Sequence, residues 1–268
     1  MKQPIGIFDS GVGGLTVFRE IRKNFPYEDI IYFGDTARVP YGPKSRNTIV
    51  EYSVQNARFL TQYGAKIIVV ACNTSSAVAL EHLQKNFSIP VIGVIESGAE
   101  AAVKATCNNK IGVIGTDGTI RSNAYFNAIS ALFSKMEIHS RACPLFVSLV
   151  EEGWENHEVT EIIIKEYLTP LLAKKIDTLV LGCTHYPILK PAIRKIVGNE
   201  IALIDSAEAL ALQLQKLIPK QEIEQDGKDT FFVSDNEEKF RKIASHILGR
   251  NIQTLMNVKL GESWYIPL

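Results

Sequence analysis

The 268-residue sequence lacks an excess of charge of either sign, since Lys and Arg together number 29 and so do Asp and Glu. A balanced chain has no overall field that attracts nucleic acid or an anionic membrane, so we expect a small-molecule partner. The sequence also lacks an apolar stretch near the roughly 20 residues of a membrane span, and its start lacks the apolar run of a signal peptide. We therefore expect a cytoplasmic protein that binds neither nucleic acid nor membrane.

The four cysteines lack the CxxC spacing of zinc and redox motifs. In a cytoplasmic chain this predicts reduced thiols and no metal site. His185 lies two residues after Cys183, but no second close pair completes a set of four zinc ligands. The glycine-rich turn at residues 9–15 lacks the full GxGxxG spacing of a dinucleotide loop, and Asp9 places a negative charge where a phosphate would bind. We expect no metal, nucleotide or other cofactor.

An internal repeat is the most informative feature that is present. Residues 66–74 (KIIVVACNT) and 177–185 (DTLVLGCTH) each read as a buried strand that ends in a cysteine. Two other pairs of segments match at a similar offset, namely 5–11 with 111–117 and 95–101 with 204–210. Val- and Ile-rich strands are common in α/β proteins, but three matches at one offset of about 110 residues indicate a gene duplication.

Short apolar strands alternate with amphipathic helices, which is typical of parallel βαβ units. One helix is expected from a capping box at Thr48 and Glu51 to a stop at Gly64, and another from Ser75 to Phe87. The polar segment at 220–230 is expected to be a surface excursion. Strands are expected near residues 4–9, 29–34, 66–71, 90–95, 110–115, 136–141, 177–182, 200–204 and 230–233.

These elements predict an α/β protein of two similar domains with mainly parallel sheets, related by a pseudo-two-fold axis. The first domain is expected to comprise residues 1–95 and 208–268, and the second 96–207, because the segment after about 208 has no counterpart in the repeat. Open parallel sheets bind ligands at the carboxyl ends of their strands, and Asp9, Cys72, Cys183 and Asp205 stand at such ends. The cleft between the domains is the expected active site.

The paired cysteines point to proton transfer on two faces of one substrate. Each thiol is expected at a helix start, where free N–H groups and the helix dipole lower a thiol pKa below its ordinary ~8.5. Inverting an α-carbon requires one group to remove a proton and another to return one to the opposite face. Asn73, Thr74 and Thr184 stand beside the thiols and supply hydrogen bonds to the carbanion.

Three further residues are candidates for managing protons at the thiols. Asp9 and His185 are expected to shuttle protons or bias the ionisation of the cysteines, and Glu151 to orient His185 by accepting its second N–H. A buried structural cap is the alternative role for Asp9. A plain turn is the alternative for the segment of Tyr41 and Gly42 after Pro40.

Four segments in this order carry a family resemblance: DSGVGGL at 9–15, GDTARVPYG at 34–42, ACNTS at 71–75 and GCTHYP at 182–187. Together they resemble glutamate racemase over essentially the whole chain. The resemblance implies a cofactor-independent isomerase with two α/β domains that is usually a homodimer. It also implies that the product is D-glutamate for peptidoglycan.

The resemblance also implies residue roles. Cys72 and Cys183 match the two catalytic thiols of the family, with Cys183 taking the proton from L-glutamate and Cys72 from D-glutamate. Asp9 matches the family residue that flanks the first thiol, and Glu151 and His185 match those that flank the second. Because Glu152 directly follows Glu151, either of the two glutamates could be the matching acid. The substrate-binding positions are matched by Asp9, Ser10, Tyr41, Gly42, Asn73, Thr74, Thr184 and His185.

Two other functions remain as alternatives. The first is a relative of the same two-thiol class that acts on aspartate or another acidic substrate. The second is a non-catalytic binding module of the periplasmic-binding type, and two strand-end thiols argue against it because binding alone needs no thiol.

Overall fold

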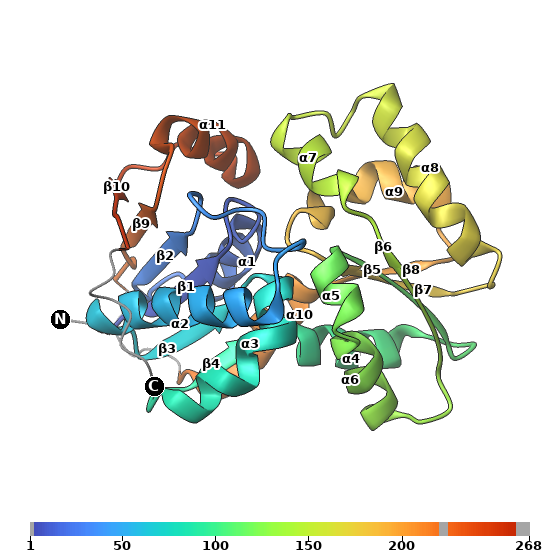
Figure 1. Ribbon diagram of the computed structural model, residues 1–268, viewed down its shortest axis with the longest axis horizontal. Helices are drawn as coiled ribbons and strands as arrows, with labels where there is room; N and C mark the ends of the chain where they lie inside the picture. The colour runs from blue at the N-terminus through green and yellow to red at the C-terminus, as the bar shows by residue number, and fades with distance from the viewer. Residues whose placement is uncertain (1–2, 220–224, 261–268) are drawn as a thin grey trace.

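The computed structural model describes residues 3–219 and 225–260 of the chain. It contains two separate sheets in which every paired strand is parallel, with helices packed on their faces (Figure 1). The predicted α/β class with two parallel sheets is therefore confirmed. The first sheet has the strands β1 (Ile5–Asp9), β2 (Ile30–Gly34), β3 (Ile67–Val70), β4 (Val91–Gly93), β9 (Asp229–Val233) and β10 (Leu255–Asn257), and the second has β5 (Lys110–Gly115), β6 (Glu137–Ala142), β7 (Thr178–Gly182) and β8 (Ala202–Asp205).

The helices follow the strands in alternation along most of the chain. They are α1 (Leu15–Asn24), α2 (Arg46–Gln62), α3 (Asn73–Asn86), α4 (Val94–Ala105), α5 (Asp117–Arg121), α6 (Ala124–Leu132), α7 (Leu145–Glu151), α8 (Glu158–Leu172), the 3₁₀ helix η1 (Tyr186–Leu189), α9 (Lys190–Val197), α10 (Ser206–Leu217) and α11 (Glu237–Leu248). Within the described ranges, no helix has both the length and the apolar composition needed to cross a membrane.

The two sheets share one internal strand order. The first runs β10-β9-β2-β1-β3-β4 and the second runs β6-β5-β7-β8, so β2-β1-β3-β4 corresponds to β6-β5-β7-β8. This correspondence pairs β1 with β5 and β3 with β7, which are the strands that the sequence repeat aligns. The C-terminal strands β9 and β10 extend the first sheet beyond β2. The exact domain limits stay a prediction from the sequence.

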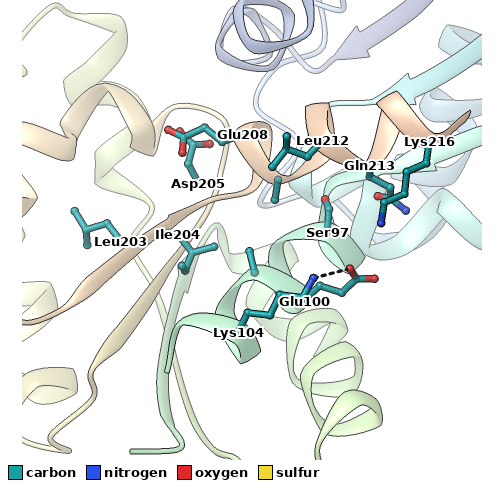
Figure 2. A pocket seen from close by; sticks show the side chains of 12 residues that line it. Ser97, Glu100, Lys104, Leu203, Ile204, Asp205, Glu208, Leu212, Gln213 and Lys216 are labelled. Carbon is teal, nitrogen blue, oxygen red and sulfur yellow. Dashed lines mark ion pairs between the residues drawn. The ribbon is translucent and has the colours of Figure 1, made fainter. Parts of the chain in front are cut away.

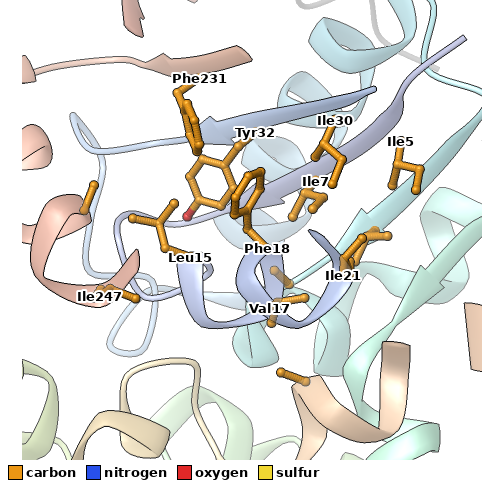
Figure 3. Close-up of a cluster of buried hydrophobic side chains, with 14 of the residues drawn as sticks. Ile5, Ile7, Leu15, Val17, Phe18, Ile21, Ile30, Tyr32, Phe231 and Ile247 are labelled. Atoms are coloured by element: carbon orange, nitrogen blue, oxygen red, sulfur yellow. The ribbon is translucent and has the colours of Figure 1, made fainter. Parts of the chain in front are cut away.

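A core of aliphatic and aromatic side chains fixes the strands that carry Asp9 and Gly34. Phe18 of α1 packs against Tyr32 and Phe231, with ring centroids 6.3 Å and 4.9 Å away (Figure 3). Leu15, Phe18 and Ile21 recur every three residues and are all buried, so one face of α1 lies on the sheet.

Several element boundaries differ from the sequence predictions. Helix α2 begins at Arg46, because the N–H of Thr48 donates to Oγ of Ser45, which caps the helix in place of Thr48. Gly64 has a φ of +78° and follows the helix end, as predicted for a stop. The strand β10 was not predicted. The predicted excursion at 220–230 falls partly on residues 220–224, which lie outside the described residues.

Candidate active site

Asp9 and the two cysteines lie where three strands end. Asp9 is the last residue of β1, Cys72 lies two residues after β3, and Cys183 directly follows β7. Helix α3 begins at Asn73, so Cys72 itself is its N-cap residue. The second thiol differs, because η1 begins only at Tyr186. All the predicted site residues except Glu151 are buried, and the exposed fractions of the two cysteines are 5% and 6%.

Asp9 joins the two halves of the molecule, of which the first is built on the six-stranded sheet and the second on the four-stranded sheet. Its Oδ2 accepts the N–H of Gly11 at 2.9 Å in its own loop, and its Oδ1 accepts the hydroxyl of Thr184 from the other half at 3.4 Å. Burial raises the pKa of this carboxyl, although the charge of His185 and nearby backbone N–H groups act to lower it. Asp9 therefore acts on residues of both halves, not on the first thiol alone.

The environment of Cys72 contradicts the prediction of a lowered pKa. Its Sγ donates to Oγ of Ser10 at 3.7 Å. Burial, and after it the negative charge of Asp9, raise the pKa of Cys72 to about 11. The N–H of Ser75 in the first turn of α3 acts in the predicted direction, but it is outweighed. The prediction of a lowered pKa weighed only the helix start, and not the opposing effects of burial and of the Asp9 carboxylate.

The second thiol begins a chain of polar contacts. Nδ1 of His185 lies 3.8 Å from Sγ of Cys183, and Nε2 lies 3.4 Å from Oε1 of Glu151, a contact too poorly aligned to count as a hydrogen bond. Glu151 is thus the acid that faces His185, while Glu152 is exposed. The other oxygen of Glu151, Oε2, lies 3.1 Å from Nζ of Lys239 in α11.

These contacts favour the charged form of both His185 and Glu151. Burial acts to lower the pKa of His185, but its contacts with Cys183 and Glu151 outweigh burial and raise it to about 10. The contact with His185 is the main reason that the pKa of Glu151 is lowered to about 2, and Lys239 adds to it. At neutral pH the site therefore holds an imidazolium next to Cys183 and a carboxylate behind the imidazolium.

Hydrogen bonds between the halves hold the residues that follow Cys72. Nδ2 of Asn73 donates to the hydroxyl of Tyr125 at 2.8 Å, and the Tyr125 hydroxyl lies 2.7 Å from Oγ of Ser206. The hydroxyl of Thr74 lies 2.8 Å from that of Thr116. The sequence prediction missed Tyr125, which no local pattern marks. It also missed Thr116, although the repeat aligns Thr116 with Ser10.

The phenol of Tyr41 is hydrogen-bonded within the first half of the molecule. The Tyr41 hydroxyl donates to Oδ2 of Asp35 and accepts from Nδ2 of Asn56 at 3.1 Å, and Nε of Arg38 lies 2.6 Å from the same Asp35 oxygen. This network anchors the turn that ends at Gly42. A Cβ at Gly42 would lie 3.0 Å from Cβ of Thr116, so this turn packs closely against the second half.

A second glycine lets the two halves meet at the thiols. A Cβ at Gly13 would lie 2.4 Å from both Nδ1 of His185 and Oγ1 of Thr184, which is too close for any side chain. The hydroxyl of Thr16 donates to the Thr184 carbonyl at 2.9 Å and closes the same contact. The two thiols are therefore buried where the two halves meet.

A surface pocket of about 300 Å³ lies outside this site, between α4 and α10 (Figure 2). Glu100 and Lys104 of α4 form an ion pair of 3.8 Å at its edge, and Leu212 of α10 contributes an apolar wall. Asp205, one of the strand-end residues noted in the sequence, lines this pocket, but no residue with a predicted catalytic or substrate-binding role does.

The family description Asp/Glu/hydantoin racemase matches residues 12–214, and the chain is 50% identical over 260 residues to a glutamate racemase of Geobacter metallireducens, with 96% of each protein covered. The chain belongs to the Asp/Glu/hydantoin racemase family. Racemases are isomerases, so it is an enzyme of that class, and the resemblance seen in the sequence is confirmed.

Solved members of the family share the fold in full. A glutamate racemase isoform of Bacillus anthracis matches with a TM-score of 0.92 at 43% identity, covering 96% of this chain and 98% of that one. A glutamate racemase of Francisella tularensis, solved in complex with D-glutamate, matches with a TM-score of 0.89 at 41% identity, covering 97% and 99%.

Proposed function

We propose that the chain interconverts L- and D-glutamate by a two-base mechanism, with Cys72 and Cys183 on opposite faces of the α-carbon. The observation that carries the proposal is that each half of the repeat contributes one strand-end thiol that interacts with an ionisable side chain. Asp9 acts on Cys72, and His185 lies 3.8 Å from Cys183. The glutamate racemases among the relatives support glutamate as the substrate.

The two thiols have different charged neighbours under this proposal. The imidazolium of His185 stabilises negative charge on the sulfur of Cys183 during proton transfer, while the pKa of about 11 keeps Cys72 protonated at neutral pH. Cys183 then removes the proton of L-glutamate and Cys72 returns one to the other face. In the reverse direction Cys72 must first pass its proton to Asp9, whose raised pKa makes it a stronger base, and Cys183 must take a proton from the imidazolium of His185. Cys72 can then remove the α-proton of D-glutamate and Cys183 can return one to the other face.

The carbanion needs stabilisation because an α-proton is very weakly acidic. Asn73 and Thr74 are the first two residues of α3, so their N–H groups have no partner within the helix and carry the positive end of its dipole. These groups, with the hydroxyl of Thr184, are suited to bind the α-carboxylate as negative charge spreads onto it. Cofactor independence, supply of D-glutamate for peptidoglycan, a cytoplasmic location and a homodimer belong to the same proposal.

Exchange of the α-proton in deuterated water tests the function. After dialysis against a chelator, wild-type protein should racemise and deuterate both enantiomers of glutamate without metal or pyridoxal phosphate. Cys72→Ala and Cys183→Ala should each lose several orders of magnitude of activity. Cys107→Ser is the matched control, because Cys107 is exposed, and it should keep full activity.

Each alternative gives a distinct result in this experiment. Faster exchange with aspartate than with glutamate would identify a relative with another substrate. Binding of glutamate without exchange would identify a binding module. Near-normal turnover in either alanine variant at the site would refute the two-base mechanism.

A further inference from the structure

Helix α11 of the C-terminal segment lies beside α7, although about 90 residues separate them in sequence (Figure 1). Phe240 and Ala244 of α11 belong to the core around β1 and α1, so the helix is fixed to the first sheet. Glu151 ends α7 and belongs to the second half. Lys239 thus presents a cation from one half of the molecule to the acid of the other, at 3.1 Å.

Glu151 is held at both carboxylate oxygens. Oε2 lies 3.1 Å from Lys239, and Oε1 lies 3.4 Å from Nε2 of His185, whose Nδ1 lies 3.8 Å from Sγ of Cys183. A carboxylate held at one oxygen only remains free to turn about its side-chain bonds. The second contact therefore decides whether Oε1 stays directed at the ring. The side chain of Glu151 is 17% exposed and that of Lys239 is 48% exposed.

We propose that Lys239 is a positioning residue for the second acid/base group, which fixes Glu151 from the first half so that Glu151 orients His185 toward Cys183. The inference rests on the proposed function, since it takes Cys183 as one of two acid/base thiols. It has a structural consequence. The surroundings of Cys183 are complete only while α11 contacts α7. The contact between the two halves and the reactivity of Cys183 are therefore coupled.

Lys239→Gln removes the charge and keeps most of the side-chain length. The kcat/KM for glutamate should fall about fivefold, the scale of a half-exposed ion pair. The α-deuterium isotope effect on kcat/KM locates the loss. A higher barrier at Cys183 should raise the isotope effect with L-glutamate, whose proton Cys183 removes, and lower it with D-glutamate, whose proton Cys72 removes.

The chain offers matched controls. His246→Gln breaks a second contact between the same segments, where Nε2 of His246 lies 2.8 Å from Oε1 of Glu155, and Lys242→Gln removes an exposed cation from the same helix. Both should leave the isotope effects unchanged. Lys239→Arg should restore them. The double variant with Glu151→Gln should behave like Glu151→Gln alone, because Lys239 acts through that residue.

Three results would overturn the inference. If Lys239→Gln has normal kinetics, the contact does not matter for catalysis. If its rate falls while both isotope effects stay unchanged, or if His246→Gln shifts them equally, α11 only holds the halves together. Failure of the proposed function looks different, because the wild-type protein would then exchange no α-proton of glutamate. Melting curves of each variant identify any loss of folded protein.

Discussion

Gly13→Ala tests whether the close approach of the two halves is needed for catalysis. The added Cβ would lie 2.4 Å from Nδ1 of His185 and from Oγ1 of Thr184, about 1 Å short of an ordinary contact. Neither atom has room to yield, because both residues are buried. The loop and the second half must therefore separate by about 1 Å, and a misplacement of that size costs about 100-fold in rate.

We expect Gly13→Ala to lower kcat/KM about 100-fold with both enantiomers, since the equilibrium constant of one ties the two values together. Circular dichroism at a wavelength where L- and D-glutamate differ measures the rate of racemisation in both directions. The backbone of Gly13 is outside the left-handed region, so alanine adds no strain there. Gly11→Ala in the same loop is the control, because its Cβ would lie 3.4 Å from Val39, an ordinary contact.

The melting temperature separates this effect from a damaged fold. A separation of about 1 Å relieves the clash of Gly13→Ala and leaves the core of each half intact, so the melting temperature should shift by less than about 2 °C. Activity near that of wild type in Gly13→Ala would refute the reasoning. An equal loss in Gly11→Ala would refute it too, since it would trace the effect to the loop and not to the contact.

Other contacts of the site give three predictions. Glu151→Gln should flatten the pH dependence of unfolding free energy, measured by urea titration. His185 contributes stability that is complete below its ordinary pKa of 6.5 and is lost as pH rises through about 10. Glu151 contributes stability that is present above its ordinary pKa of 4.5 and is lost as pH falls through about 2. An unchanged profile in Glu151→Gln would contradict the contact between these two residues. Tyr41→Phe deprives the buried Asp35 of a donor and should cost about 1–3 kcal/mol of unfolding free energy, with KM for glutamate changed less than about threefold; a large rise in KM would instead place the phenol on the substrate. A limiting amount of thiol reagent should modify Cys107 first with activity retained, as peptide mass spectrometry will show, and early inactivation would contradict the burial of the site thiols.

The strands of the repeat are predictable because a buried parallel strand requires an apolar run, and segments such as 66–71 allow little else. The short strand β10 gives no such signal. Only Leu255 of its three residues is buried, and its pairing with β9 depends on tertiary contact. The start of α2 was placed too late because Ser45 and Thr48 are both acceptable caps, and the local sequence does not choose between them.

Residues at strand ends are predictable as a site, since parallel strands bring their carboxyl ends to one edge. Partners from distant segments are not. Tyr125 and Lys239 take part through contacts with Asn73 and Glu151, which lie about 50 and about 90 residues away. The raised pKa of Cys72 was missed for the same reason, because burial is a property of the folded chain.

The strand orders of the two sheets have a consequence for how the chain acquires its structure. The strands of the second sheet all come from one continuous stretch, 110–205, whereas the first sheet also needs β9 and β10 from residues 229–257. During synthesis the second sheet can therefore be finished while β2 still presents an unpaired edge, the feature that exposes a nascent chain to aggregation. Helix α11 emerges between β9 and β10, so Lys239 reaches Glu151 among the last contacts to form. An incomplete chain thus contains both thiols before it contains Lys239, which positions the groups around Cys183.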